Sequence, residues 1–299
     1  MAVTKRAIEN DGEWKRWRDR VVGASEVGAL LGIHDYLTYF ELYQLKRGSL
    51  PRFEATEVMT DGLLMQEVAL KKIQRQFPEM HAYDPRIYYC DSELGVGATP
   101  DCFAEDPVRG LGTIQIKHVD RDEFRKRWGE VPPLWICLQV TQEAWLSGAK
   151  WGRICAIVAD HGLNLHWYDV DIRDDVIAVI KKEVQEFWRR VKDEDPPAPD
   201  YARDADTIRA VYPLDDGNEI DLSADNEISA LAEQYAEAKK LVSATEKNAS
   251  AIGAEIFHKM GNASLARYNG GYITAKTIYR AAHEVKASTY RPLRVVSKQ

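Results

Sequence analysis

The sequence predicts an α/β fold, in which a mixed sheet is flanked by helices and a long C-terminal helix plus β-hairpin is added. Up to residue 191, stretches with helical periodicity alternate with short apolar strands. A charged, proline-rich segment at 193–200 cannot continue a helix and divides the chain. Beyond it, apolar residues recur at spacings of three and four, as along the seam of a coiled coil. We therefore expect two domains, residues 1–195 and 196–299.

The first half of the chain begins with helices and continues with strands. Residues 11–50 have helical periodicity, with turns at Gly32 and Gly48. Residues 57–77 are predicted to form an amphipathic helix, because their apolar side chains fall on one side. A turn at 91–95 then separates the first two of three short predicted strands. The three strands are 86–90, 96–103 and 113–119.

The second half repeats the alternation before the long helix. Two prolines precede a predicted helix at 134–147, and the elements that follow are strands 154–159 and 163–170 and a helix at 174–191. Ser223 is predicted to cap the long helix, which ends at Gly261. Its seam runs from Ile228 to Ile256 and could join two chains, although packing against its own protein is favoured. Asn269-Gly270-Gly271 predicts the hairpin turn.

The composition is that of a globular protein with a real core. The chain has 299 residues, of which 45% are hydrophobic, and a formal net charge of −7. An acidic net charge excludes a protein that coats nucleic acid through a uniformly basic surface, so any DNA contact requires a local basic patch. Residues 1–20 contain no apolar run, and we expect a cytoplasmic protein with no membrane contact. None of the four cysteines forms a C-x-x-C pair, which predicts neither a zinc knuckle nor a disulfide framework.

Polar residues with the chemistry of a metal-dependent nuclease lie on the central predicted strands. Asp101 ends one strand, and Gln115 and Lys117 lie on the next. Because strand side chains alternate, Gln115 and Lys117 share one face while Ile114 and Ile116 point to the other, into a core. An acidic residue beside a polar-x-Lys pair offers oxygen ligands for Mg²⁺ and a cation next to the attacked phosphate.

Four motifs in chain order resemble those of the lambda exonuclease, or YqaJ-type viral recombinase, family of the PD-(D/E)xK nuclease superfamily. The resemblance covers residues 14–190. Each motif alone could be a turn or a solvated face, but their common order favours the family. The motifs are Trp14-Lys15-Arg16-Trp17-Arg18 with Ala24-Ser25-Glu26-Val27, Gly62-Leu63-Leu64-Met65-Gln66, Thr99-Pro100-Asp101 with Gln115-Ile116-Lys117, and Gln139-Val140-Thr141-Gln142 with Trp145.

The resemblance implies a restriction-endonuclease-like fold and a role for each catalytic residue. Asp101, the Gln115 side chain and the Ile116 carbonyl would ligate Mg²⁺, or Mn²⁺ in its place. Lys117 would orient the attacking water and stabilise the charge that builds on the phosphate. Gln139 would hold the water or the scissile phosphate from its helix.

The resemblance also implies the substrate and the partners. Arg18 would bind the terminal 5′-phosphate as a planar fork, with help from Ser25. The chain would degrade one strand of double-stranded DNA from its end, 5′ to 3′, and leave a single strand for a phage annealing recombinase. A ring-shaped trimer threaded by DNA would fit an acidic protein that is basic only inside. The basic segment 121–127 could line such a channel or be a solvated helix.

Two positions where the family keeps carboxylates are glutamines here. Gln66 and Gln115 retain a carbonyl acceptor but carry no charge. Since Mg²⁺ is usually held by one or two carboxylates, Asp101 alone should bind it more weakly. Glu67 and Glu143 are further carboxylates that could take the missing role. Members of the wider superfamily use Gln-x-Lys, so activity is compatible with the change. The alternatives are a catalytically weakened DNA-end-binding protein and an endonuclease of the same superfamily.

Overall fold

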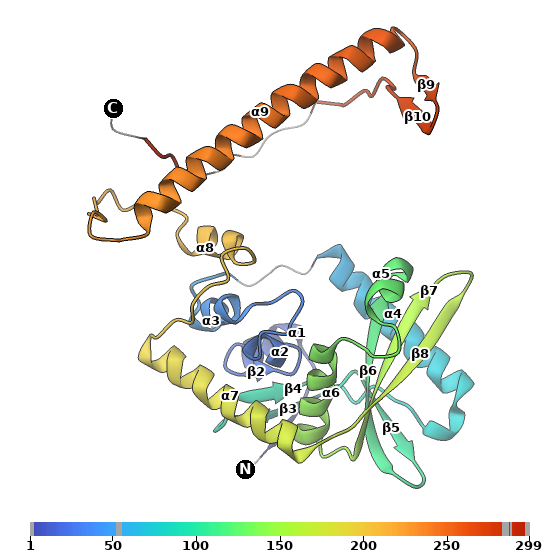
Figure 1. Cartoon of the computed structure of the whole chain (residues 1–299). Helices are drawn as coiled ribbons and strands as arrows, with labels where there is room; N and C mark the ends of the chain where they lie inside the picture. The colour runs from blue at the N-terminus through green and yellow to red at the C-terminus, as the bar shows by residue number, and fades with distance from the viewer. Residues whose placement is uncertain (1–2, 52–55, 283–286, 288, 297–299) are drawn as a thin grey trace. The chain divides into compact units, whose positions relative to one another are not determined.

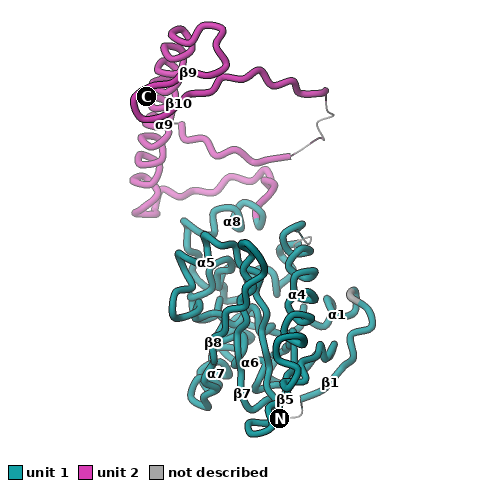
Figure 2. The backbone as a smooth tube through the Cα atoms, turned by 90° about the vertical axis from the view of Figure 1, so that its right-hand side faces the viewer, with its two compact units in different colours: residues 1–211 teal, residues 212–299 magenta. Residues whose placement is uncertain are grey.

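The computed structural model describes residues 3–51, 56–282, 287 and 289–296. Its helices and strands are labelled in Figure 1. The chain divides into two compact units, residues 1–211 and 212–299, which are coloured separately in Figure 2. The predicted fold class is confirmed, because sheets flanked by helices make up the first unit and a long helix with a hairpin makes up the second.

The first unit contains a small sheet built mainly from the N-terminal part of the chain. Its strands lie in the order β1-β3-β4-β2, with β2 parallel to β4 and the other pairs antiparallel. Three helices of the same region accompany it, and Val22, Val27, Leu42 and Tyr43 are fully buried there. The elements are β1 (Thr4–Ala7), α1 (Asp11–Arg18), β2 (Val22–Gly23), α2 (Val27–Leu30), α3 (Tyr39–Arg47), β3 (Ile87–Asp91) and β4 (Val96–Ala98).

A second, mixed sheet carries the central strands. Its order is β5-β6-β7-β8, from β5 (Cys102–Asp106), β6 (Gly110–Val119), β7 (Trp151–Ala159) and β8 (Leu163–Val170). The pairs β5–β6 and β7–β8 are antiparallel, whereas β6 and β7 are parallel. Parallel neighbours need a crossover, and α5 (Arg121–Arg127) and α6 (Leu134–Ser147) provide it. Gly148, with a φ of 82°, then ends α6 in the left-handed conformation that favours glycine.

The predicted single strand at 96–103 is wrong, because the chain breaks at Thr99-Pro100-Asp101. β4 ends at Ala98 and β5 begins at Cys102, so that one predicted sheet becomes two. Proline has no N–H to donate to a ladder, which explains the position of the break. Asp101 consequently lies in a short connection between the sheets. Gln142 of α6 connects that helix to the small sheet, since its Nε2 donates to the carbonyls of Val22 in β2 and Gly97 in β4 at 3.0 Å each.

The two faces of β6 are covered by different helices. α4 (Glu57–Gln76) packs Ala69 and Ile73 against Ile114 and Ile116. α6 covers the other face, where its Ile136 and Val140 pack with apolar residues of β7. The face that carries Gln115 and Lys117 is therefore the face under α6, as the alternation of strand side chains requires.

The C-terminal part of the first unit comprises α7 (Asp174–Asp193), the proline-rich segment and α8 (Ala205–Val211). α7 buries Ile177, Ile180, Val184 and Phe187 in the core of the small sheet. Asp204 is fully buried, accepting hydrogen bonds from the Thr38 hydroxyl at 2.5 Å and from the Asp200 backbone at 2.7 Å. This segment thus lies within the first unit, and the functional division predicted at residue 195 stays a prediction.

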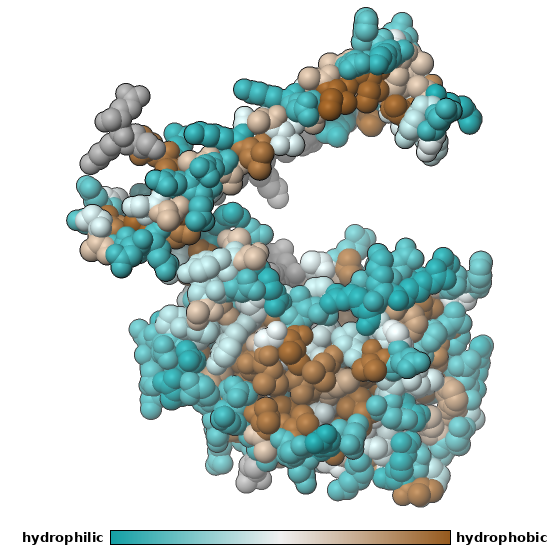
Figure 3. Space-filling view, viewed as in Figure 1, coloured by the Kyte–Doolittle hydropathy of each residue, from teal (hydrophilic) through white to brown (hydrophobic). Residues whose placement is uncertain are grey.

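The second unit contains α9 (Ile228–Met260) and the hairpin of β9 (Leu265–Tyr268) and β10 (Gly271–Thr274). α9 begins later than the predicted cap at Ser223, because Asp225 Oδ1 accepts from the backbone of Glu227 and Ile228 instead. No residue of α9 is buried among the described parts of the chain. Figure 3 shows apolar side chains exposed along α9, and Leu231, Val242 and Ile252 are each about half exposed.

No helix in the described residues combines the length and apolarity that a membrane crossing requires. A short helical turn, η1 (Pro78–Met80), completes the elements of the first unit.

Candidate active site

Asp101 lies against the start of the Gln115–Lys117 motif. Its Oδ2 accepts hydrogen bonds from the Ile116 backbone N–H, at 2.9 Å, and from Gln115 Nε2. Gln115 Nε2 also lies 3.4 Å from the Ile116 carbonyl oxygen. The three predicted protein ligands, Asp101, Gln115 and the Ile116 carbonyl, are therefore brought together in one small volume.

α6 adds two polar side chains to this volume. Lys117 Nζ donates to Gln139 Oε1 at 3.0 Å, and Gln139 Nε2 donates to Gln115 Oε1 at 2.7 Å and to Glu143 Oε1 at 2.9 Å. Gln139 and Glu143 are four residues apart, so they share one face of α6. Gln115, Gln139 and Glu143 are 2%, 6% and 0% exposed. We call Asp101, Gln115, Lys117, Gln139 and Glu143 the amide cluster.

The amide cluster holds the carboxylate of Glu143 away from bulk water, whereas Asp101 and Lys117 are partly exposed. Burial raises the pKa of Asp101 to about 6, although Lys117 opposes the shift. Burial and the nearby charge of Asp101 raise the pKa of Glu143 well above its usual value. Burial lowers the pKa of Lys117, against the attraction of both carboxylates. Burial is the largest cause of all three shifts, so the site disfavours the charged form of each group.

Aromatic side chains flank Lys117 and were not predicted as part of the site. Lys117 Nζ lies 5.3 Å from the centre of the Trp135 ring, which also contacts the His34 ring at 4.4 Å. Trp135 Nε1 donates to Asp35 at 3.0 Å. His34 Nδ1 accepts two backbone N–H bonds of its own loop, and burial lowers its pKa, so it is neutral near pH 7. These contacts join β6 and α6 to the loop at His34 and Asp35, which is distant in sequence, and no local motif indicates them.

Gln66 lies on α4, which packs on the opposite face of β6 from α6. It is partly buried, and no hydrogen bond within the described residues joins it to the amide cluster. Its predicted catalytic role stays a prediction. Glu67, the neighbouring carboxylate, is exposed.

A second polar cluster surrounds the predicted DNA-binding residues at the end of α1. Arg18 Nη2 donates to the Ser25 hydroxyl at 3.1 Å and lies 4.0 Å from Glu26 Oε1. Glu26 Oε2 is 2.7 Å from Lys46 Nζ and accepts the Gly23 N–H at 2.7 Å. We call Arg18, Ser25, Glu26 and Lys46 the arginine cluster. It brings together both predicted phosphate-binding residues, together with Lys46, which no sequence motif marked.

The arginine cluster has an excess of positive charge. Burial alone would raise the pKa of Glu26, but Lys46 and Arg18 lower it below its usual value. One carboxylate thus faces two cations. Arg18 also lies 4.8 Å from the centre of the Trp14 ring, and Trp14 Nε1 donates to the Thr99 hydroxyl at 3.0 Å. Since Thr99 lies two residues before Asp101, this contact connects the arginine cluster to the amide cluster.

The donor set of the amide cluster fits a hard divalent cation. Carboxylate and carbonyl oxygens are the ligands that Mg²⁺ prefers. In addition, Glu143 Oε2 is buried with no hydrogen bond in the described part of the chain. The same residues include no group of three His, Cys, Asp or Glu side chains that could hold a metal by themselves. Any metal site here therefore depends on backbone, amide or substrate oxygens as well.

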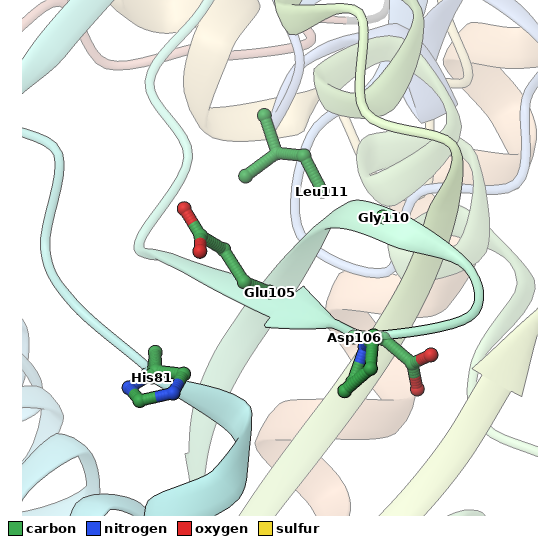
Figure 4. A pocket seen from close by; sticks show the side chains of 6 residues that line it. His81, Glu105, Asp106, Gly110 and Leu111 are labelled. Atoms are coloured by element: carbon green, nitrogen blue, oxygen red, sulfur yellow. The ribbon is translucent and has the colours of Figure 1, made fainter.

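A separate pocket of about 250 Å³ lies at the far end of the β5–β6 hairpin (Figure 4). Asp106 pairs with Gly110 there, whereas Cys102, next to Asp101, pairs with Ile114 at the other end. The Asp106 carboxylate is occupied by the backbone N–H groups of its own turn. The pocket gathers none of the predicted site residues. Its lining is His81, Glu105, Asp106, Pro107, Gly110 and Leu111.

The basic segment 121–127 forms α5, and ion pairs occupy part of its charge. Arg121 contacts Asp160 at 2.9 Å, and Arg127 contacts Asp35 at 2.5 Å and Glu123 at 3.0 Å. The basic side chains of α5 are exposed, and a DNA channel along them stays a prediction.

Comparison with known proteins gives one relative across most of the chain. The chain is 24% identical to the uncharacterized protein YqaJ of Bacillus subtilis (strain 168) over 267 residues, which cover 87% of this chain and 82% of that protein. The predicted resemblance to the YqaJ-type family is confirmed. No protein-family model matches the chain.

Solved structures similar to this YqaJ-like chain include an alkaline exonuclease (LHK-Exo) from Laribacter hongkongensis. It is 21% identical, with a TM-score of 0.43, and the match covers 61% of this chain and 93% of that one. LHK-Exo in complex with dAMP gives 20% identity, the same TM-score and the same coverage.

Proposed function

We propose that the chain is a Mg²⁺-dependent exonuclease that degrades one strand of double-stranded DNA from its end. The observation that carries the proposal is the amide cluster. Residues from separate motifs, Asp101, Gln115, Lys117 and Gln139, meet there in one continuous set of hydrogen bonds. A solvated strand face would not bury Gln115 and Gln139 or hold Lys117 against a helix.

The chain's own residues supply the following chemistry. Asp101 and the Ile116 carbonyl, with Gln115, hold the metal, which when bound lowers the pKa of a water and neutralises phosphate charge. Lys117 stabilises the negative charge that develops on the attacked phosphate. Gln139 keeps Lys117 in position through its 3.0 Å hydrogen bond and offers its amide to the water or the phosphate.

Specificity for DNA ends comes from the arginine cluster. Arg18 and Ser25 bind the terminal 5′-phosphate, because a guanidinium fork matches phosphate oxygens and the cluster carries one positive charge beyond its carboxylate. The contact from Trp14 to Thr99 fixes this cluster relative to Asp101. Binding of the 5′-phosphate beside the metal would give degradation in the 5′ to 3′ direction.

The proposal extends to partners. Residues 1–195 carry the chemistry, and 196–299 carry assembly, either into a trimer around DNA or onto a single-strand annealing recombinase in the cytoplasm. The exposed apolar seam of α9 supports an assembly role, because a helix of this length gains most of its stability by burying an apolar face.

A second candidate function is a DNA-end-binding protein with little catalysis. The observation that favours it is the direction of the Gln115 amide, whose Nε2 donates to Asp101 where a carboxylate would leave room for a cation. Metal entry then requires the Gln115 amide to turn over.

The test uses linear duplex with a 5′-phosphate and a covalently closed circle, each incubated with Mg²⁺, Mn²⁺ or EDTA. An exonuclease shortens the linear duplex with metal and leaves the circle intact, whereas an endonuclease of the same superfamily opens the circle. Retention of both DNAs, with retarded migration of the linear one, would favour the end-binding protein. In that case Gln115→Glu, which restores a carboxylate, should produce cleavage.

A further inference from the structure

Glu143 is a buried carboxylate, and one of its oxygens has no hydrogen bond of good geometry among the described residues. It is 0% exposed, its Oε1 accepts from Gln139 at 2.9 Å, and its Oε2 has no hydrogen bond among the described residues. The Thr113 hydroxyl, on the strand face of Gln115 and Lys117, is close enough to lower the pKa of Glu143, but neither this hydroxyl nor Glu143 Oε2 makes a hydrogen bond of good geometry among the described residues. A buried polar atom left in this way is energetically unfavourable, by about 1–3 kcal/mol for a typical group.

Glu143 and Asp101 share one nearby cation. Lys117 is the cation that acts on Glu143, and it acts on Asp101 as well. A buried charge without an opposite charge beside it is energetically unfavourable. A cation that enters the amide cluster therefore meets two carboxyl groups that share one ammonium.

Glu143 is also placed beside the position where a carboxylate is missing. Gln139 Nε2 lies 2.7 Å from Gln115 Oε1 and 2.9 Å from Glu143 Oε1, so that both oxygens converge on one amide group. Position 115, where the resembled family keeps a carboxylate, carries the uncharged amide of Gln115. Glu143 of α6 presents a carboxylate on the other side of the Gln139 amide.

We propose that Glu143 is the second carboxylate ligand of the divalent metal, in place of the carboxylate that position 115 lacks. The inference rests on the proposed function only for the identity of the cation. The ligands of the metal would come from both sides of the β6–α6 contact. Asp101 and the Ile116 carbonyl would lie on one side and Glu143 on the other. Gln139 must release Glu143 for the metal to bind, which frees its amide for the water or the phosphate.

The test moves the carboxylate and measures Mn²⁺ affinity by calorimetry on the full chain. Glu143→Gln should weaken binding about tenfold or more, the order of effect seen when groups around a metal are removed. Gln115→Glu should strengthen it, and the double variant, which carries one carboxylate at 115 instead of 143, should return close to the parent affinity. Glu105→Gln, an exposed position on β5, is the matched control and should bind as the parent does.

Parent affinity in Glu143→Gln would overturn the proposal, including when cleavage falls, because Glu143 would then only orient Gln139. If Glu143→Gln failed to fold, the same comparison would be made in the Gln115→Glu background, where equal affinities with and without Glu143 would overturn it. Mn²⁺ binding that depends on Glu143 in a protein that cleaves no DNA would contradict the nuclease proposal alone. Metal-dependent cleavage with unchanged Mn²⁺ affinity in Glu143→Gln would contradict this inference alone.

Discussion

The amide cluster and the arginine cluster each bury a glutamate, and the two glutamates are in opposite electrostatic states. Glu26 faces Lys46 and Arg18, and its pKa is lowered despite burial. Glu143 has one hydrogen bond to Gln139 and shares Lys117 with Asp101, and its pKa is raised. Glu26 is thus paired with cations of the chain, whereas Glu143 Oε2 has no hydrogen bond among the described residues.

The difference shows what each cluster can bind. With one carboxylate and two cations, the arginine cluster has one positive charge to offer to an anion such as a phosphate. With two carboxylates and one cation, the amide cluster has a negative charge to offer to a metal. The proposed phosphate site and the proposed metal site thus differ in their ratio of carboxylates to cations, and the pKa shifts of their glutamates have opposite signs.

The largest expected effect is on the amide cluster. Lys117→Ala should reduce cleavage of linear duplex about 100- to 1,000-fold, because it removes the cation that stabilises the developing phosphate charge. Mn²⁺ affinity should be maintained or increased, since a repelling charge is lost. Lys150→Ala, at an exposed lysine of the loop before β7, provides the control. Cleavage at the parent rate in Lys117→Ala would place the active site elsewhere.

The next effect is on stability through the arginine cluster. Glu26→Gln should destabilise the protein by about 3 kcal/mol, because it leaves the 5%-exposed Lys46 ammonium buried without its partner. A lowered carboxyl pKa contributes stability that is present above its unfolded value of 4.5 and is lost as pH falls below it. Denaturant unfolding should therefore show a difference that is full at pH 7 and shrinks below about pH 4.5. A difference independent of pH would mean that shape, not charge, matters at this position.

Arg18→Ala tests whether the arginine cluster binds the terminal 5′-phosphate. Loss of a charged hydrogen-bond donor to the terminal phosphate is worth about 1.5–3 kcal/mol, or roughly 10- to 100-fold in the rate on 5′-phosphorylated ends. Ends with a 5′-hydroxyl should be affected much less. Competition between the two kinds of end in one reaction measures the ratio directly, and equal slowing would reduce Arg18 to a general backbone contact.

Glu143→Gln should have the opposite sign to Glu26→Gln when metal is removed by EDTA. It relieves a buried charge without stranding a partner, so we expect a gain of about 1 kcal/mol. A raised carboxyl pKa destabilises the folded state as pH rises through and above 4.5, so the gain should vanish near pH 4 and be largest near neutrality. A loss of stability at pH 7 would show that the carboxylate is satisfied in the metal-free protein.

The smallest expected effect on chemistry is that of removing the second unit. A chain ending at Val211 retains both clusters, and its cleavage rate per active site and its Mn²⁺ affinity should stay within about twofold of the parent. Its oligomeric state or its partner binding should change, because the exposed seam of α9 is gone. Light scattering compares the two chains, and an insoluble fragment would show that the first unit does not fold alone.

The sequence predicted those parts of the fold and the site that depend on local rules. The two-residue period of strands placed Gln115 and Lys117 on one face, and helical periodicity gave α4, α6 and α7 within a few residues. The hairpin turn at Asn269-Gly270 follows from turn chemistry. Pro100 was visible, yet its effect on the strand at 96–103 was not predicted, because a proline can also sit at a sheet edge.

The remaining features depend on contacts that are distant in sequence. Lys46 of α3 pairs with Glu26, which precedes α2, and Trp135 of α6 packs on Lys117 of β6. No pattern of neighbours along the chain indicates such pairs. The unsatisfied oxygen of Glu143 is still harder to predict, because it requires a full account of which groups lie nearby. Sequence could name Glu143 as a carboxylate but not show that it is buried and short of a partner.

The most direct test of the account is the Mn²⁺ affinity of four proteins, measured by calorimetry under one condition. These are the parent, Asp101→Asn, Glu143→Gln and Arg18→Ala. The account predicts that the parent binds Mn²⁺, that Asp101→Asn and Glu143→Gln bind it at least about tenfold more weakly, and that Arg18→Ala binds it as the parent does. Equal affinity in all four proteins, or no binding by the parent, would contradict the claim that the amide cluster is a cation site.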